Sequence, residues 1–252
     1  MLCRNIMEQI ETTYPIQSAL EWDNVGLLVG RSDKEVKCIY VTLDVTDEAI
    51  DDAIAKHADL ILSHHPILFS PLRQLTNEHF IGKRIIQLLQ HDICCYAMHT
   101  NYDILRMADL AGKILELQST EVLEDTGIGI VGTLKEEITL SECCELVKAC
   151  FDLPGVKVFG KGDKKIKKVA ICPGSGKHMT ELAIAKQADV FITAEIDHHE
   201  GIDSVAQGIA VVDAGHYGLE HIFIEDMATY LKENLEGIRV EIAKISHPFL
   251  FV

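Results

Sequence analysis

Two adjacent histidines follow a short apolar run and precede a proline, in the segment Ser63-His64-His65-Pro66. The apolar residues before them have the length of a buried strand, and Pro66 cannot extend a hydrogen-bonded ladder, so we expect the strand to end here. Ligands collect at the carboxyl ends of strands in open α/β sheets, and histidine is the commonest metal ligand near neutral pH. The pair therefore indicates a metal site, with two solvated histidines at a strand end as the alternative.

Two further histidines each precede a carboxylate by four residues: His99 precedes Asp103, and His216 precedes Glu220. Each pair follows an apolar run, and this spacing places both side chains of a pair on one face of a helix. For either pair alone, a helix-capping carboxylate beside an unrelated histidine is the simpler interpretation. Two pairs at matching positions, together with the His-His segment, favour a cage of nitrogen and oxygen ligands.

The donor types limit the metal without identifying it. Imidazole and carboxylate groups without thiolate suit Zn, Fe, Mn or Ni. Six candidate ligands are more than one tetrahedral ion needs, so bridging carboxylates could hold two divalent ions about 3.5–4 Å apart. None of the eight cysteines forms a C-x-x-C pair, which argues against a cysteine-based zinc site.

Composition excludes several classes of protein. The chain has 252 residues, of which 48% are hydrophobic, so it can bury a sizeable core in one large domain or two small ones. A formal charge of -16 disfavours binding to bulk nucleic acid, and an anionic substrate would need a local positive group such as a metal. We find no apolar run of about 18 residues and no basic-then-apolar leader, so we expect a reduced, cytoplasmic protein without membrane contact.

The elements that must position these residues follow a βαβ pattern. A strand over 37–43, a helix over 46–57 with Thr46 as its N-cap, and the strand from Leu60 form one such unit, which predicts a parallel pair of strands. We interpret the basic stretch 160–168 as a solvated hairpin or linker, and 125–132 as a boundary or crossing strand. The other expected strands are 93–98, 169–172, 190–193, 210–213 and 238–245, and the other expected helices are 1–14, 77–90, 103–115, 141–150, 180–187 and 219–235.

An internal repeat connects the two halves of the chain. Residues 54–60 read IAKHADL and residues 184–190 read IAKQADV, each at the end of an expected helix that leads into a strand. Farther along, aligning 93–103 with 210–220 matches His99 to His216 and Asp103 to Glu220. We therefore predict an α/β fold of two similar lobes from an internal duplication, 1–125 and 126–252, with no inserted domain and with the metal site in the cleft between the lobes.

The motifs together resemble those of a known family. They are Glu21-Trp22-Asp23-Asn24-Val25-Gly26-Leu27, Leu43-Asp44-Val45-Thr46, Ser63-His64-His65-Pro66, His99-Thr100-Asn101-Tyr102-Asp103 and Asp213-Ala214-Gly215-His216-Tyr217-Gly218-Leu219-Glu220. In these segments the chain is similar to the YbgI-type proteins, also called the NGG-one-interacting-factor-three family. Members of that family are commonly named GTP cyclohydrolase 1 type 2. The motifs extend over nearly the whole chain and are specific as a set.

The resemblance implies a dinuclear metal site and the residues that hold it. Its ligands would be His64, His65, Asp103, His216 and Glu220, with the two carboxylates bridging the ions. The resemblance also implies a ring-shaped homohexamer. His99 matches the family motif without being an expected ligand, so we expect it to support the site or to move protons as a catalytic residue.

The same resemblance implies a reaction. It is the opening of the guanine imidazole ring of GTP by metal-activated water, with loss of formate, so a small nucleotide would be the substrate. A dinuclear phosphoesterase or amidohydrolase acting on another substrate is one alternative. A metal-binding adaptor without turnover is the other.

Four other segments leave their interpretation open. Gly174-Ser175-Gly176-Lys177 lacks the spacing of a Walker motif and is either an anion-binding turn or a plain tight turn. Glu195 with His198-His199-Glu200 lines the same cleft or forms a solvated loop. Trp22-Asp23-Asn24 shapes the rim of the site or is an acidic turn. The apolar residues 249–252 form an edge strand or a subunit contact.

Overall fold

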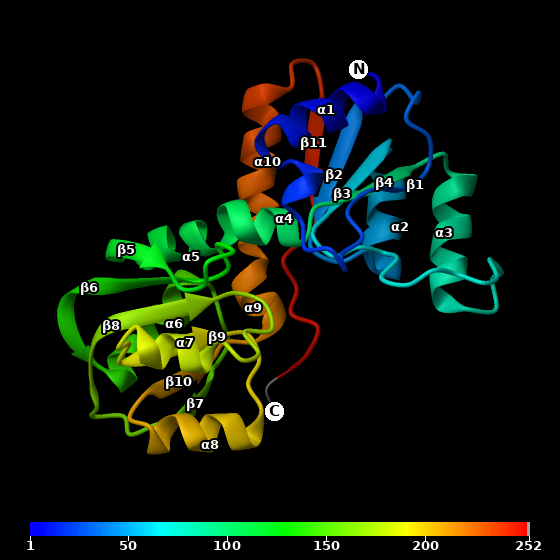
Figure 1. Ribbon diagram of the computed structural model, residues 1–252. Helices are drawn as coiled ribbons and strands as arrows, with labels where there is room; N and C mark the ends of the chain where they lie inside the picture. Colours follow the sequence, from blue (N-terminus) through cyan, green and yellow to red (C-terminus); the bar gives the residue numbers. More distant parts are fainter. Residues whose placement is uncertain (251–252) are drawn as a thin grey trace. The chain divides into compact units, whose positions relative to one another are not determined.

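The structure, a computed structural model, describes residues 1–250 and shows an α/β fold with two separate sheets (Figure 1). The chain divides into two compact units. The first unit comprises Met1–Tyr102 and Phe223–Ile245, and the second comprises Asp103–Ile222 and the segment after Ile245. The predicted α/β class is therefore confirmed, and each candidate ligand belongs to one of two units that are described separately below.

The first unit is built on a five-stranded sheet of order β1-β4-β3-β2-β11. Its strands are β1 (Gly26–Val29), β2 (Cys38–Thr42), β3 (Leu60–Ser63), β4 (Cys94–Ala97) and β11 (Arg239–Ile242). The strand β1 is antiparallel to β4, whereas β4, β3, β2 and β11 run parallel to one another. The helices are α1 (Cys3–Thr13), η1 (Ile16–Ser18), α2 (Asp47–Ala55), α3 (Phe80–Gln90), α4 (Thr100–Tyr102) and most of α10 (Ile222–Asn234).

The second unit is built on a six-stranded sheet of order β5-β6-β8-β9-β10-β7. Its strands are β5 (Gln118–Val122), β6 (Ile130–Thr139), β7 (Lys157–Phe159), β8 (Lys165–Cys172), β9 (Val190–Thr193) and β10 (Ala210–Asp213). The strands β8, β9 and β10 are parallel, and β7 is antiparallel to β10. The helical elements are the π-helical segment η2 (Asp103–Met107), α5 (Ala108–Ile114), α6 (Leu140–Cys150), α7 (Thr180–Ala185), α8 (His198–Ala206) and α9 (His216–Glu220).

Four strands of each unit have the same order and directions. The set β1-β4-β3-β2 corresponds to β7-β10-β9-β8, with the antiparallel strand at the same edge. The two units also share an aspartate that holds a neighbouring strand. Asp59 accepts hydrogen bonds from the backbone N–H groups of Lys37 and Cys38, and Asp189 accepts them from those of Lys167 and Lys168. A duplication in ancestry remains a prediction that this shared pattern supports.

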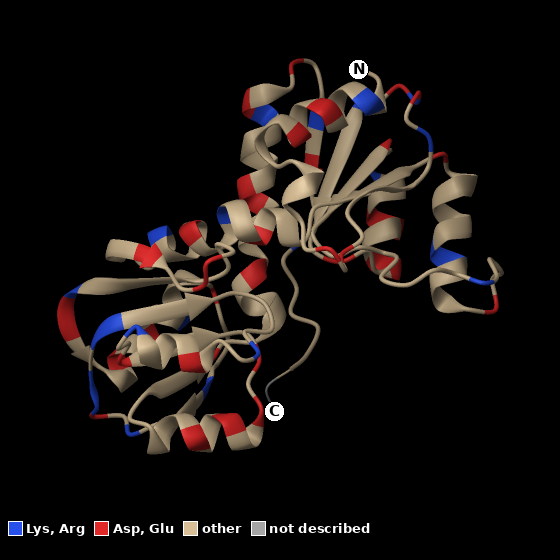
Figure 2. Ribbon diagram, viewed as in Figure 1, with Lys and Arg blue, Asp and Glu red and all other residues tan. Residues whose placement is uncertain are grey.

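Local sequence explains why the parallel strands are central. The strands β2, β3, β4 and β9 carry no charged residue, as Figure 2 shows, and every residue in them is buried. Two helices, α2 and α6, begin at side-chain caps that the sequence supplies. Thr46 accepts the N–H of Ala49 at the start of α2, as predicted, and Thr139 forms a capping box with Glu142 at the start of α6. These caps and buried strands fix where each loop leaves the sheet.

The structure differs from the sequence-based expectations in several segments. Residues 160–168 are not only a solvated loop, because β8 begins at Lys165 and buries Ile166 within the sheet. Helical structure begins at Thr100 rather than Asp103 and continues through η2 and α5. The compact units also divide after Tyr102 and again after Ile222, whereas the predicted lobes met at 125/126, because α10 and β11 complete the first sheet.

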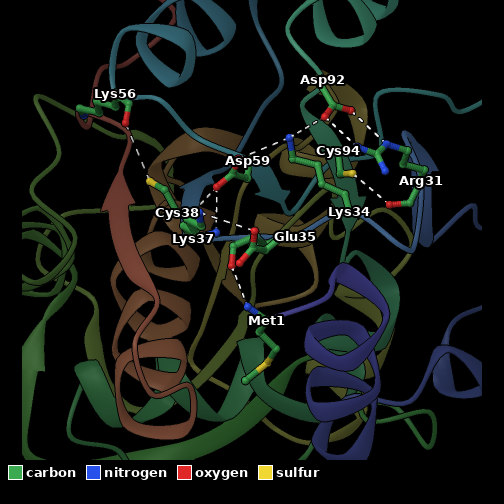
Figure 3. A network of polar contacts seen from close by, with 11 residues as sticks. Met1, Arg31, Lys34, Glu35, Lys37, Cys38, Lys56, Asp59, Asp92 and Cys94 are labelled. Carbon is green, nitrogen blue, oxygen red and sulfur yellow. Dashed lines mark hydrogen bonds and ion pairs between the residues drawn. The ribbon is translucent and has the colours of Figure 1, made fainter.

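A polar network ties the amino-terminus to the starts of β2 and β4 (Figure 3). The terminal amine donates to the carbonyl of Val36, and Lys34 lies 3.0 Å from Asp92 and 3.4 Å from Asp59. This network lies at the amino ends of the parallel strands, away from the strand ends that carry the histidines.

Among the described residues, no helix is long and apolar enough to cross a membrane. Of the apolar tail, residues 249–250 form no strand, and Phe251 and Val252 lie outside the described residues.

Candidate metal centre

Three imidazoles meet at the carboxyl ends of two neighbouring strands in the first unit. His64 and His65 follow β3, and His99 follows β4, which is parallel to β3 and paired with it. One ring nitrogen from each of the three lies within 4.8 Å of the others. The ring centroids of His64 lie 5.0 Å from His65 and 5.3 Å from His99. This convergence is the arrangement that ligands of a single cation require.

Each of these imidazoles is held through Nδ1 by an oxygen atom. The Nδ1 of His64 lies 2.8 Å from the carbonyl oxygen of Met98, which can only accept, so this nitrogen carries the proton. The Nδ1 of His65 lies 2.7 Å from Asp44, and that of His99 lies 2.9 Å from Asp23. Donation from Nδ1 leaves Nε2 as the ring atom with a lone pair. Imidazoles that bind metals in proteins are oriented in this way, so the three side chains fit a metal.

Asp23 is the most strongly held of these oxygen partners. Its side chain is 0% exposed and accepts hydrogen bonds from the backbone N–H and the hydroxyl of Thr100, at 2.9 and 2.6 Å. Burial raises the pKa of Asp23, but the hydrogen bonds from His99 and Thr100 outweigh burial and lower it to about 2. Asp23 therefore stays ionised near neutral pH and keeps the ring of His99 in one orientation.

His64 is buried beside Tyr102 and Phe223, which lie at the two places where the chain passes from one compact unit to the other. His64 is 0% exposed, and its ring centroid lies 5.1 Å from that of Phe223 and 6.0 Å from that of Tyr102. Tyr102 donates in turn to Asp226 on α10 at 2.7 Å. On the more open side, the rings of Trp22 and Phe69 lie 5.9 and 5.7 Å from His99. Trp22 belongs to the segment predicted to shape a rim. It lies beside His99 and is 65% exposed.

The second unit carries a similar arrangement around His216. His216 begins α9 directly after Gly215, whose φ of 76° is a conformation that favours glycine. Its Nδ1 lies 3.1 Å from Glu195, which follows β9, and its Nε2 lies 2.9 Å from Glu220. The Glu220 side chain is only 3% exposed. The predicted i, i+4 contact of His216 with Glu220 is thus present, and Glu195 supports the ring as Asp23 supports His99.

Asp103 is the other carboxylate of this unit. It opens η2 directly after the last residue of α4. Burial raises the pKa of the Cys172 thiol, and the negative charges of Asp103 and Glu220 raise it further. Both carboxylates therefore act on the same side chain at the end of β8, and the second unit presents one imidazole and two acids.

The remaining polar segments have other surroundings. Gly176 packs against the side chain of Thr193, so the glycine turn after β8 is explained by close packing. His198 and His199 open α8 and line a separate pocket with Lys177. Of the second polar cluster, Glu195 contacts the predicted ligand His216. These contacts do not support the binding of an anion at the glycine turn.

Sequence reasoning did not assign Asp23 and Asp44 to the histidines that they hold. Each partner is distant along the chain: His99 is 76 positions after Asp23, and His65 is 21 positions after Asp44. Both acids occur in the motifs that carried the resemblance. For Asp44 the signal was an acid directly after a predicted strand, whereas Asp23 lay outside the predicted elements. Neither acid had a spacing that connects it to a particular histidine.

Comparison with known proteins agrees with these motifs. The model of the Duf34/NIF3 (NGG1p interacting factor 3) family matches residues 1–248. A protein of Clostridium acetobutylicum named GTP cyclohydrolase 1 type 2 homolog is 35% identical over 226 residues, covering 86% of this chain and 84% of that protein. A protein of the same name from Streptococcus pneumoniae serotype 4 is 35% identical over 243 residues, covering 92% and 91%.

Solved structures show the same fold. A Bacillus cereus protein related to NIF3 matches with a TM-score of 0.95 and 25% identity, covering 100% of this chain and 99% of that one. A Staphylococcus aureus protein matches with a TM-score of 0.92 and 27% identity, again covering 100% and 99%. The fold, the motifs and the names of these relatives all indicate one family.

Proposed function

This chain belongs to the Duf34/NIF3 family, and from that membership we propose that it is a metal-dependent hydrolase that opens the imidazole ring of guanine in GTP and releases formate. The observation that carries the proposal is the set of three imidazoles in the first unit, each with its Nδ1 on an oxygen atom. Donation from Nδ1 leaves the Nε2 atoms of His64 and His65 available to a cation and the Nε2 of His99 available for proton transfer.

We propose that two divalent ions are held by His64, His65, Asp103, His216 and Glu220. Covalent connection supports this set, because Asp103 directly follows Tyr102, and Glu220 is three residues before Phe223. The rings of Tyr102 and Phe223 both lie beside that of His64. Asp103 and Glu220 are thus close along the chain to residues that surround His64. We propose that they complete the coordination of the ion that His64 binds. Zn, Fe, Mn and Ni all fit these donors.

The bound ions would polarise a substrate oxygen and lower the pKa of water to near neutrality. The chain's own residues provide orientation and proton transfer. Asp23 fixes the ring of His99 so that Nε2 can accept a proton from the attacking water and return it to the opening ring. Trp22 and Phe69 flank His99 and limit the access of bulk solvent to that nitrogen.

The test is a turnover assay on purified protein loaded with each candidate metal in turn. We expect formate and a pterin product from GTP, and at least a 100-fold lower rate for His99→Gln with unchanged metal content. His91→Gln is the matched control, since His91 is an exposed histidine of the same unit. Cleavage of phosphoesters without formate would instead support a dinuclear phosphoesterase. Metal binding without turnover of any nucleotide would support an adaptor.

We also propose that the chain assembles as a homohexamer in a reducing, cytoplasmic environment. The eight cysteines are all free, and seven of them are buried, which is compatible with a reducing compartment. Exposed apolar side chains in the first unit supply surface for contacts between subunits.

A further inference from the structure

A pocket within the second unit opens beside His216. Its volume is about 490 Å³, which is sufficient for a nucleoside. It is lined by Lys157 from β7, Asp213 from the end of β10, and the aromatic side chains of Tyr217 and Phe249. Glu195 and His216 complete its polar wall. The pocket therefore combines aromatic faces with a charged pair next to a proposed metal ligand.

The aromatic wall is held in place by contacts with the C-terminal segment. The hydroxyl of Tyr217 accepts the backbone N–H of Ser246 at 3.1 Å. His247 bridges the two aromatic residues, with ring centroids 5.5 Å from Tyr217 and 5.9 Å from Phe249. Phe249 remains 41% exposed although it is a large apolar side chain. A planar aromatic ligand that stacks in the pocket would cover it.

The charged pair presents a donor and an acceptor side by side. Lys157 Nζ lies 2.6 Å from one carboxylate oxygen of Asp213, and the other oxygen accepts the N–H of Gly215 at 3.2 Å. Because Asp213 neutralises Lys157 and Glu195 adds a negative charge, the pocket does not favour a phosphate group. The pocket favours an uncharged ring that has, on one edge, a hydrogen-bond acceptor next to hydrogen-bond donors.

We propose that this pocket binds a guanine base, with Lys157 and Asp213 as the residues that select it. The lysine donates to O6, and the carboxylate accepts from N1–H and the N2 amino group. Tyr217 and Phe249 contact the faces of the ring. The proposal rests on the proposed function, because it assigns base recognition for the substrate of that same site.

The edge chemistry predicts an order of ligands. Inosine lacks the N2 amino group and loses one of the two hydrogen bonds to the carboxylate. Xanthosine places a carbonyl oxygen against that carboxylate and is repelled. Adenosine offers a single donor at this edge. A hydrogen bond to a charged group accounts for roughly tenfold or more in affinity, so guanosine should bind at least tenfold more tightly than inosine.

The experiment measures nucleoside binding by calorimetry with the full chain, both as purified and after chelation. Asp213→Asn should weaken guanosine at least tenfold and strengthen xanthosine, because the amide can donate to its carbonyl. Lys157→Met should weaken guanosine and leave melting temperature near wild type. Lys161→Met is the matched control, since Lys161 is exposed in the same unit and outside this pocket.

Three results would overturn the inference: no guanosine binding by the wild-type chain at millimolar concentration, equal affinity for guanosine and xanthosine, or unchanged guanosine binding in both folded variants. The outcome is separable from that of the turnover assay. Selective guanosine binding without formate production would keep the inference and remove the proposed reaction. Formate production that is unaffected in both variants would remove the inference alone.

Discussion

At the scale of single residues, the candidate ligands depend on the oxygen atoms behind them. His64, His65, His99 and His216 each have Nδ1 within hydrogen-bonding distance of an oxygen. Three of those oxygens belong to carboxylates from other loops. The candidate ligands could be predicted from sequence, because an apolar run ending in His-His and an i, i+4 pair are local patterns. Their supporting acids were not, because only the fold brings these loops together.

Replacing Asp23 tests this support directly. Asp23→Asn keeps the size of the side chain but removes the charge that accepts from His99 and Thr100. We expect a loss of about 1.5–3 kcal/mol in the free energy of unfolding. We also expect turnover to fall by about 10–100-fold with the orientation of His99. Urea unfolding and the formate assay measure the two effects. Asp33→Asn is the control, since Asp33 is an exposed acid of the same unit and should cost less than about 0.5 kcal/mol.

Asp23 also predicts how stability responds to acid. Its pKa falls from the ordinary value of 3.8 to about 2 on folding. A lowered pKa stabilises the folded state above the ordinary value, and this contribution, about 2 kcal/mol, is lost as the pH falls from about 4 toward 2. Urea unfolding of the metal-free chain across this range should show the loss. In Asp23→Asn this part of the pH dependence should be missing, and an identical dependence in both proteins would contradict the assignment.

At the scale of elements, continuous apolar runs predicted the parallel strands, and apolar residues at helical spacing predicted most helices. The strand β8 was partly missed because Lys165, Lys167 and Lys168 suggested a solvated loop. Its alternation of exposed and buried positions around Ile166 was the available signal. The strand β1 was missed because a segment of four residues is too short to show periodicity, and the helix α8 was missed because its polar residues give little apolar periodicity.

The repeated aspartate anchor makes an element-scale prediction. Asp59 and Asp189 each accept two backbone N–H groups at the start of a parallel strand. Because each substitution leaves two strand N–H groups without their acceptor, Asp59→Ala and Asp189→Ala should each cost about 2 kcal/mol in unfolding free energy. Chemical denaturation checks this, with Asp163→Ala as an exposed control in the second unit. A large effect at one anchor and none at the other would show that the two positions are not equivalent.

At the scale of the whole molecule, the two-lobed α/β organisation was predictable because the repeat IAKHADL/IAKQADV marks matching helix ends. The exact grouping of segments was not. Helical periodicity shows that α10 has an apolar face, but it does not show which sheet that face covers. The return of α10 and β11 to the first unit therefore emerged only from the fold.

The proposed homohexamer makes a prediction at this scale. Phe69, Leu75 and Phe80 are 59%, 47% and 59% exposed, and we propose that these apolar side chains contribute to the contacts between subunits. We expect sedimentation to give six times the chain mass of 28.0 kDa. Leu75→Glu should shift the protein to smaller species by placing a charge in the contact. A wild-type protein that sediments as a monomer at micromolar concentration would contradict this prediction.

Elemental analysis after dialysis, applied to the purified chain and to three variants, measures directly whether the proposed centre holds metal. We expect about two divalent ions per wild-type chain. His65→Asn and Glu220→Gln should lose most of this metal with their fold intact, and His91→Asn should retain it. Equal metal content in all four folded proteins, or none in the wild type after loading with Zn, Fe, Mn or Ni, would contradict the proposed centre.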